Sequence, residues 1–265
     1  MAVRLPLLLA TTLAAAPAGA QQLAYDWPAP DASATAAATE PAEAAPPSEG
    51  EDGSSNPPWL QYALLDLLEW SFAKGGDGYA WDFSSMVGGK RDRVYLASTG
   101  EGASSGRLDY LELEALYSRW VGSDIDLNLG VRWDARPGPR RLYLAAGGQL
   151  DTGTLWLGAF AYLSKQGEPS ARLGGYYNWA LTRRLTLQPS FELDAYGKDV
   201  PALGLGRGLS YAELGLRLRY EIAAHLAPYV GVSWSRDLGR TARLTRAAGD
   251  DPETKSLVAG LHSEF

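Results

Sequence analysis

The segment that decides the fold is 212–222, which reads Ala212-Glu213-Leu214-Gly215-Leu216-Arg217-Leu218-Arg219-Tyr220-Glu221-Ile222. Its even positions are apolar, and its odd positions are small or charged. Side chains of a β-strand point alternately to its two faces, so the pattern predicts a strand with one apolar and one charged face. In a membrane barrel the apolar face contacts lipid and the charged face lines a wet lumen.

The same alternation recurs along the chain and predicts twelve strands. They cover 59–70, 79–88, 93–100, 107–120, 125–136, 141–150, 154–164, 170–181, 184–197, 209–222, 226–236 and 256–265. Tight turns alternate with connections that include two longer loops, 197–209 and 237–255, which is the asymmetry of outer-membrane barrels. We therefore predict an all-β fold, a closed antiparallel transmembrane β-barrel of twelve strands.

Large aromatic side chains fall on the predicted apolar faces, often near the ends of strands. These residues are Trp59, Trp81, Tyr117, Trp133, Trp179 and Trp234. Amphipathic rings prefer the headgroup level of a membrane, so we expect these side chains to form an interface girdle.

Two segments precede the predicted barrel. Residues 1–20 are typical of a signal peptide, with Arg4 before an apolar run and a small-residue cleavage site that ends at Ala20. Residues 21–58 are rich in Ala, Pro, Glu and Ser and hold seven acids and no Lys or Arg. Such a segment buries too little apolar surface to fold, so we predict a disordered acidic tail in the periplasm. The barrel, 59–265, sums to a charge of about −1 and has no basic patch, which argues against a nucleic-acid partner.

Short segments along 59–265 keep the order and spacing of one known family. They are Leu65-Asp66-Leu67-Leu68-Glu69, Trp81-Asp82, Gly88-Gly89, Gly100-Glu101-Gly102, Glu114-Ala115-Leu116-Tyr117-Ser118-Arg119, Arg132-Trp133-Asp134-Ala135-Arg136-Pro137-Gly138-Pro139, Ala171-Arg172-Leu173, Leu187-Gln188-Pro189, Tyr196-Gly197-Lys198-Asp199, Leu214-Gly215-Leu216-Arg217-Leu218-Arg219-Tyr220-Glu221-Ile222, Ala227-Pro228-Tyr229-Val230-Gly231-Val232 and Ala247-Ala248-Gly249. In these segments the chain resembles the copper resistance protein B family of outer-membrane barrels.

The resemblance implies a function in copper homeostasis at the outer membrane of a Gram-negative bacterium, by binding copper ions or passing them across that membrane. It also implies a periplasmic multicopper oxidase of the same resistance system as a partner, besides the membrane lipid. Members of the family commonly carry Met- and His-rich repeats before the barrel, whereas 21–58 contains neither residue here. Thioether and imidazole are the ligands that suit copper, so the departure argues against copper storage in this tail.

Alternation places a set of charged side chains on the predicted lumen faces. The acids are Asp82, Glu112, Glu114, Asp134, Glu192, Asp194 and Glu213, and the arginines are Arg132, Arg136, Arg172, Arg217 and Arg219. Two interpretations stay open. The acids attract cations along a pathway, or the acids and arginines form a structural ladder of ion pairs that fills the lumen.

Soft copper ligands are scarce in the predicted barrel. Met86 and His262 share parity with lumen-facing acids, and their strands both flank the first strand of a closed barrel. We predict that any copper site is weak or transient and uses Met86 and His262 with the carboxylates of Asp82 and Glu114. The alternative is a Met that fills a packing gap and a His that is hydrogen-bonded in the lumen.

An enzymatic role is not expected. A Ser-His-acid site needs a His beside a nucleophile, and the sequence offers His225 in a predicted turn and His262 near the periplasmic side. Ser263 adjoins His262 but points to the opposite face. The sequence therefore predicts copper handling, and the alternative is a narrow nonspecific small-solute channel or a structural barrel that has lost metal handling.

Overall fold

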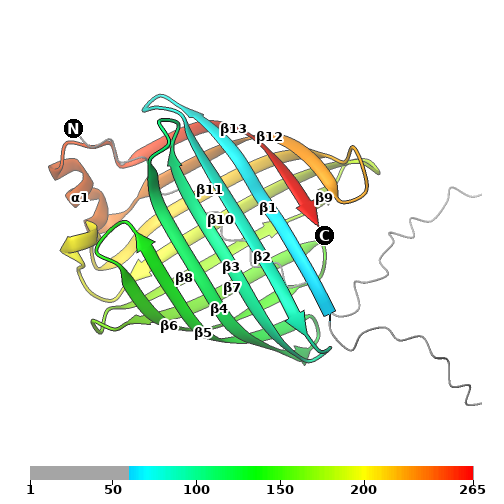
Figure 1. The fold of residues 1–265 in the computed structure, drawn as a ribbon. Coiled ribbons are helices and arrows are strands. Elements are labelled where there is room, and N and C mark those ends of the chain that lie inside the picture. The colour runs from blue at the N-terminus through cyan, green and yellow to red at the C-terminus, as the bar shows by residue number, and fades with distance from the viewer. Residues whose placement is uncertain (1–59, 265) are drawn as a thin grey trace, which may run out of the picture.

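The computed structural model describes residues 60–264, which form a closed antiparallel β-barrel (Figure 1). Its strands are β1 (Leu60–Ala73), β2 (Gly78–Gly88), β3 (Asp92–Ala103), β4 (Leu108–Gly122), β5 (Ile125–Arg136), β6 (Arg141–Asp151), β7 (Leu155–Ser164), β8 (Pro169–Tyr177), β9 (Trp179–Ala180), β10 (Leu185–Tyr196), β11 (Gly208–Tyr220), β12 (Leu226–Asp237) and β13 (Glu253–Glu264). β1 pairs with β13 and β10 pairs with β11, so the sheet closes on itself. β8 and β9 both pair with β10 and count as one interrupted strand, which confirms the predicted twelve-stranded barrel.

The strand boundaries differ from the predicted ones by a few residues. The differences of three residues are at β1, which continues to Ala73, at β3, which continues to Ala103, and at β13, which begins at Glu253. β13 starts early because Glu253 and Thr254 pair with Arg236 and Ser235 of β12. The predicted signal peptide, 1–20, and the predicted tail, 21–58, lie outside the described residues.

The two faces of the strands follow the alternation of the sequence. In β11, Leu214 and Leu216 are exposed on the outer face, and Glu213, Arg217 and Arg219 are buried inside. The same division holds in β5, whose outward leucines and valine are exposed. The barrel therefore has an apolar outer surface and a polar interior, the reverse of a soluble protein.

The connections sort into two ends of the barrel. The loop end carries 74–77, 104–107, 137–140, 165–168, 197–207 and 238–252, and the turn end carries 89–91, 123–124, 152–154, 181–184 and 221–225. Both predicted long loops lie at the loop end, and the described chain starts and finishes at the turn end. Figure 1 shows the helix α1 (Gly239–Ala247) at the opposite end of the barrel from the C-terminus.

Two short helices at the loop end are not predicted by the sequence analysis. η2 (Pro201–Leu203) and α1 lie in the loops that alternation leaves without structure. In α1, Thr241 and Thr245 are buried against the barrel mouth, where Thr241 accepts a hydrogen bond from the Gly206 amide at 2.9 Å and Thr245 donates one to Asp237 at 2.5 Å. Among residues 60–264, no helix is long and apolar enough to cross a membrane.

Outward aromatic side chains gather near both ends of the barrel. Each of four tryptophans lies three residues from the loop end of its strand: Trp70, Trp81, Trp133 and Trp234. Near the turn end the outer surface carries Tyr117, Trp179 and Tyr220, all exposed. Two such levels are what the two interfaces of a membrane require. Trp59 lies outside the described residues.

The orientation can be tested with single cysteines, because the sequence contains no Cys. We expect Arg243→Cys, on the exposed face of α1, to react with a membrane-impermeant maleimide in intact cells. Arg183→Cys, in an exposed turn at the turn end, should react only after the outer membrane is disrupted. The opposite labelling pattern would show that the loop end faces the periplasm.

Candidate functional site

The interior of the barrel holds more carboxylates than cations. Among the described residues, twelve acids and six arginines are buried. The acids are Asp66, Glu69, Asp82, Glu101, Glu112, Glu114, Asp126, Asp134, Asp151, Glu192, Asp194 and Glu213, and the arginines are Arg93, Arg132, Arg141, Arg172, Arg217 and Arg219. All seven acids that alternation places in the lumen are among them.

The larger ion-pair network is centred on Glu112 of β4. Arg132 of β5 lies 2.7 Å from Glu112 and 2.7 Å from Asp134. Arg172 of β8 lies 3.2 Å from Glu112 and 3.1 Å from Asp194 of β10. Because β4 and β8 are not neighbours in the sheet, the pair of Arg172 and Glu112 connects separate parts of the barrel wall. We call these five residues the Glu112 network.

Tyrosines surround the Glu112 network and satisfy its remaining groups. The Tyr110 hydroxyl donates to Glu112 and accepts a hydrogen bond from Arg132 at 3.2 Å. The Arg132 guanidinium also lies over the ring of Tyr162, 4.7 Å from its centre, and over that of Tyr143, at 5.3 Å. Such cation–π contacts and hydrogen bonds lower the cost of burying the arginine.

A second network joins β1 to β11. Arg217 lies 2.8 Å from Glu69, and Arg219 lies 3.2 Å from Asp66. β12 and β13 stand between these strands in the sheet, so the pairs bridge over the inner faces of two strands. His262 of β13 belongs to the same network, because its Nδ1 atom is 3.1 Å from the Asp66 carboxylate.

Asp66 and Glu69 are functional candidates that the sequence analysis missed. Strict alternation cannot place two residues three apart on one face. The register of β1 shifts between Leu65 and Leu68, and this bulge turns Asp66 and Leu67 inward together. Two acids three apart in an otherwise apolar strand were the signal for the bulge.

The pairing register arranges the inner wall of β2 to β6 in rows. Two carboxylate rows lie nearer the loop end: Asp82, Thr99, Glu112, Asp134 and Arg141, then Ser84, Ala97, Glu114, Arg132 and Tyr143. One step closer to the turn end is an apolar row: Met86, Tyr95, Leu116, Gly130 and Ala145. A polar group that moves from the loop end therefore meets carboxylates first and apolar side chains next.

The predicted copper contacts occupy different rows of this wall. Asp82 accepts a hydrogen bond from Thr99 at 3.0 Å, and Glu114 stands opposite Arg132. Met86 faces inward as predicted and is 3% exposed, packed in a buried cluster with aromatic side chains. The thioether thus sits one row from Glu114, in surroundings that suit sulfur.

His262 lies inside the barrel near the turn end, at another height from Met86. Its Nδ1 atom faces Asp66, and its Nε2 atom is 3.6 Å from Glu264. Met86 stands opposite Tyr62 of β1, whereas His262 contacts Asp66, which lies four residues closer to the loop end, about 13 Å away along β1. Within residues 60–264, no group of three or more His, Asp or Glu side chains is placed to hold one metal ion.

The remaining predicted lumen charges are Glu192, Asp194, Glu213 and Arg219, and all are buried in the barrel. Glu213 accepts hydrogen bonds from Tyr211 at 2.7 Å and Ser233 at 3.1 Å. The prediction for Arg136 is wrong. It is the last residue of β5 and is exposed at the loop end, because a register shift between Leu111 and Glu112 pairs it with the outward Leu111.

Comparisons with known proteins agree with this architecture. A family model described as "Copper resistance protein B precursor (CopB)" matches residues 59–265. The chain is 42% identical over 205 residues to the copper resistance protein B homolog of Pseudomonas syringae pv. tomato (strain ATCC BAA-871 / DC3000), covering 77% of this chain and 69% of that protein. It is 40% identical over 203 residues to copper resistance protein B of Escherichia coli, covering 76% and 68%. Among solved structures, the NanC porin has a TM-score of 0.52 and 15% identity, over 76% of this chain and all of that one, and shows the fold alone.

Proposed function

This chain belongs to the copper resistance protein B family, an outer-membrane β-barrel family related to copper resistance, and on that basis we propose that its acidic lumen binds copper ions and conducts them across the outer membrane. The observation that carries the proposal is the excess of six buried carboxylates over buried arginines within residues 60–264. Fixed negative charge inside a low-dielectric wall concentrates cations and repels anions.

The proposed path has three stages. A copper ion that enters at the loop end meets the carboxylate rows, where Asp82 and Glu114 provide oxygen contacts. It then passes the soft ligands of the lumen, which are the Met86 thioether and the His262 imidazole beside Asp66, before it reaches the turn end. Because these side chains lie at different heights, each contact is weak and transient, which suits passage better than storage.

The segment before the barrel is proposed to add little to copper binding. Residues 21–58 contain no Met or His, so their carboxylates offer hard ligands that favour no particular transition metal. The partner proposed at the turn end is the periplasmic multicopper oxidase that the family resemblance implies.

One observation favours the alternative of a structural barrel or a narrow nonspecific channel. The pairs Arg172–Glu112 and Arg217–Glu69 each join strands that are not neighbours, as a lumen-filling scaffold would. The two candidates differ in what they require of the acids outside these two pairs. A scaffold does not need Asp82 and Glu114 to be charged, whereas a copper path does.

Copper retention by the purified barrel, together with copper tolerance of producing cells, tests the proposal. We expect Asp82→Asn with Glu114→Gln, and separately Met86→Leu with His262→Gln, to lower both quantities. Deletion of 21–58 should change neither. The matched control is Asp124→Asn with Glu221→Gln, two exposed acids at the turn end.

The barrel fold of each variant is checked by its heat-modifiable migration in electrophoresis. Wild-type retention in both lumen variants would contradict the proposal and leave the scaffold alternative. Loss of retention on deletion of 21–58, with both lumen variants unaffected, would place copper binding in the tail.

A further inference from the structure

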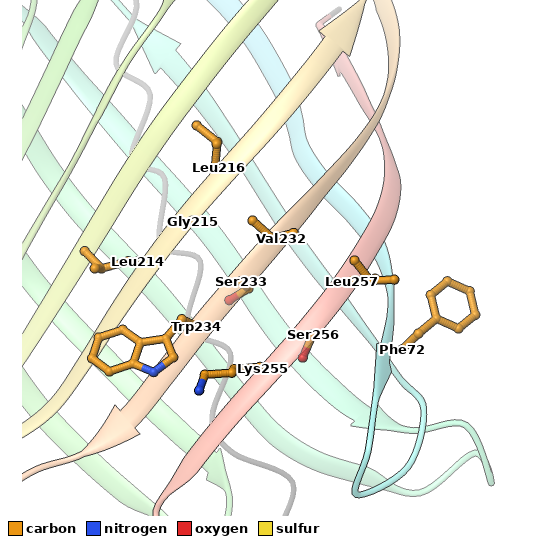
Figure 2. A pocket seen from close by; sticks show the side chains of 10 residues that line it. All are labelled: Phe72, Leu214, Gly215, Leu216, Val232, Ser233, Trp234, Lys255, Ser256 and Leu257. Carbon is orange, nitrogen blue, oxygen red and sulfur yellow. The ribbon is translucent and has the colours of Figure 1, made fainter.

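An open groove of about 570 Å³ crosses the outer surface of β11, β12, β13 and β1 (Figure 2). Two outward rows form its walls. The apolar row is Leu216, Val232, Leu257 and Phe72, and the row closer to the loop end is Leu214, Trp234 and Lys255. Between the rows, the backbone of Gly215, Ser233 and Ser256 forms the floor; these residues pair in register, and the two serine side chains face the lumen.

The groove is therefore apolar along one wall and cationic at one corner. Figure 2 shows Lys255 beside Trp234 on the neighbouring strand. The Lys255 side chain is 75% exposed, although a groove surrounded by hydrocarbon offers no water to a cation. Trp234 lies at the aromatic level of the loop end, where an ammonium group can reach the headgroups.

The charges at this corner leave a net positive excess. Glu253 is the shared acceptor: Lys255 lies 2.7 Å from its carboxylate, Arg236 lies 3.9 Å away, and the Trp234 indole donates to it at 3.1 Å. Two cations thus share one carboxylate. Arg236 is also 42% exposed, so both cations can accept a second anionic partner without breaking a buried contact.

We propose that this groove is a specific site for a phosphorylated lipid of the outer leaflet, lipid A. One acyl chain lies against Leu216, Val232 and Leu257, and Lys255 and Arg236 hold a phosphate at the headgroup level. Charge-assisted hydrogen bonds from Arg and Lys are the strong contacts for phosphate. The site is separate from the lumen, so it is independent of the proposed copper path.

Native mass spectrometry of the detergent-solubilised barrel, titrated with diphosphoryl lipid A, tests the proposal. We expect one lipid per barrel. The variant Arg236→Gln with Lys255→Gln removes the phosphate contacts, and Val232→Phe fills the groove, so each should weaken binding about tenfold or more.

Two matched controls lie outside the groove. Lys90→Gln with Arg119→Gln removes a lysine and an arginine at the turn end, and Val131→Phe enlarges an outward valine that is 45% exposed, against 47% for Val232. Both should bind lipid A as the wild type does. All variants should keep the heat-modifiable migration of a folded barrel.

Three results would overturn the proposal. Equal binding by the groove variants and their controls would show that lipid A does not bind in this groove. Phosphatidylethanolamine has one phosphodiester that is balanced by its own ammonium group, so binding of this lipid as tightly as lipid A would show that the groove is not specific for lipid A. A change in oligomeric state on Val232→Phe, measured by light scattering, would make the groove an interface between barrels.

Discussion

Replacing Arg172 by Met is expected to destabilise the barrel by about 3–5 kcal/mol, because it leaves buried carboxylates without their cation. Arg172 lies within 3.2 Å of both Glu112 and Asp194, and 3.7 Å from Glu192. Its side chain is 6% exposed, so water cannot replace the guanidinium. The midpoint of urea unfolding in lipid vesicles, followed by tryptophan fluorescence, measures the loss.

The control for this prediction is Arg183→Met, which removes the same group from an exposed turn and should change the free energy of unfolding by less than about 0.5 kcal/mol. Adding Glu112→Gln to Arg172→Met should restore part of the stability, since it removes one of the buried carboxylates that lost their partner Arg172. An unchanged midpoint for Arg172→Met would mean that the Glu112 network is solvated and carries little energy.

Replacing Gly130 by Ala is expected to cost about 1–3 kcal/mol through overpacking. A Cβ atom at Gly130 would lie 2.1 Å from the Ala115 carbonyl oxygen and 2.7 Å from the Leu116 Cα atom. Both are backbone atoms of β4, so the two strands would have to separate. The same unfolding measurement reports the effect.

Gly75→Ala serves as the matched control, because a Cβ atom at Gly75 meets nothing within 4 Å. Its midpoint should stay within the error of the wild type or rise slightly, as the added Cβ restricts the unfolded chain. Equal midpoints for the two alanine variants would show that β4 and β5 can adjust to each other at no cost.

Much of the fold was predictable from the alternation of apolar and polar side chains with a period of two residues. In β11 the alternation from Glu213 to Tyr220 is unbroken, and each side chain lies on the predicted face. α1 was not predictable in this way. Its nine residues are held by tertiary contacts of Thr241 and Thr245 with the rest of the mouth, and these follow only once the barrel brings β11 and β12 together.

The candidate site was predictable where strands keep a constant register and not where they shift. Parity placed Glu114 and Arg132 correctly because β4 and β5 pair without a shift between them at that level. It missed Asp66 because one extra residue in β1 reverses the parity of everything beyond it. Parity also could not give the position of each side chain along the barrel. Met86 and His262 both face inward, but their spacing in the sequence does not show how far apart they lie along the strands.

The pairing of β1 with β13 also governs how the protein is made. Asp66 and His262, which are 196 residues apart, come into contact only when the last strand, β13, pairs with β1. Until then both flanks of the growing sheet present unsatisfied amide and carbonyl groups, which invite pairing with other chains. Closing so long a segment carries a large entropic penalty, and proteins dominated by such distant contacts fold slowly. Before β1 pairs with β13, a protein of this topology is therefore an open sheet that is prone to aggregation. We expect the yield of folded protein to depend on preventing this aggregation as much as on the stability of the closed barrel.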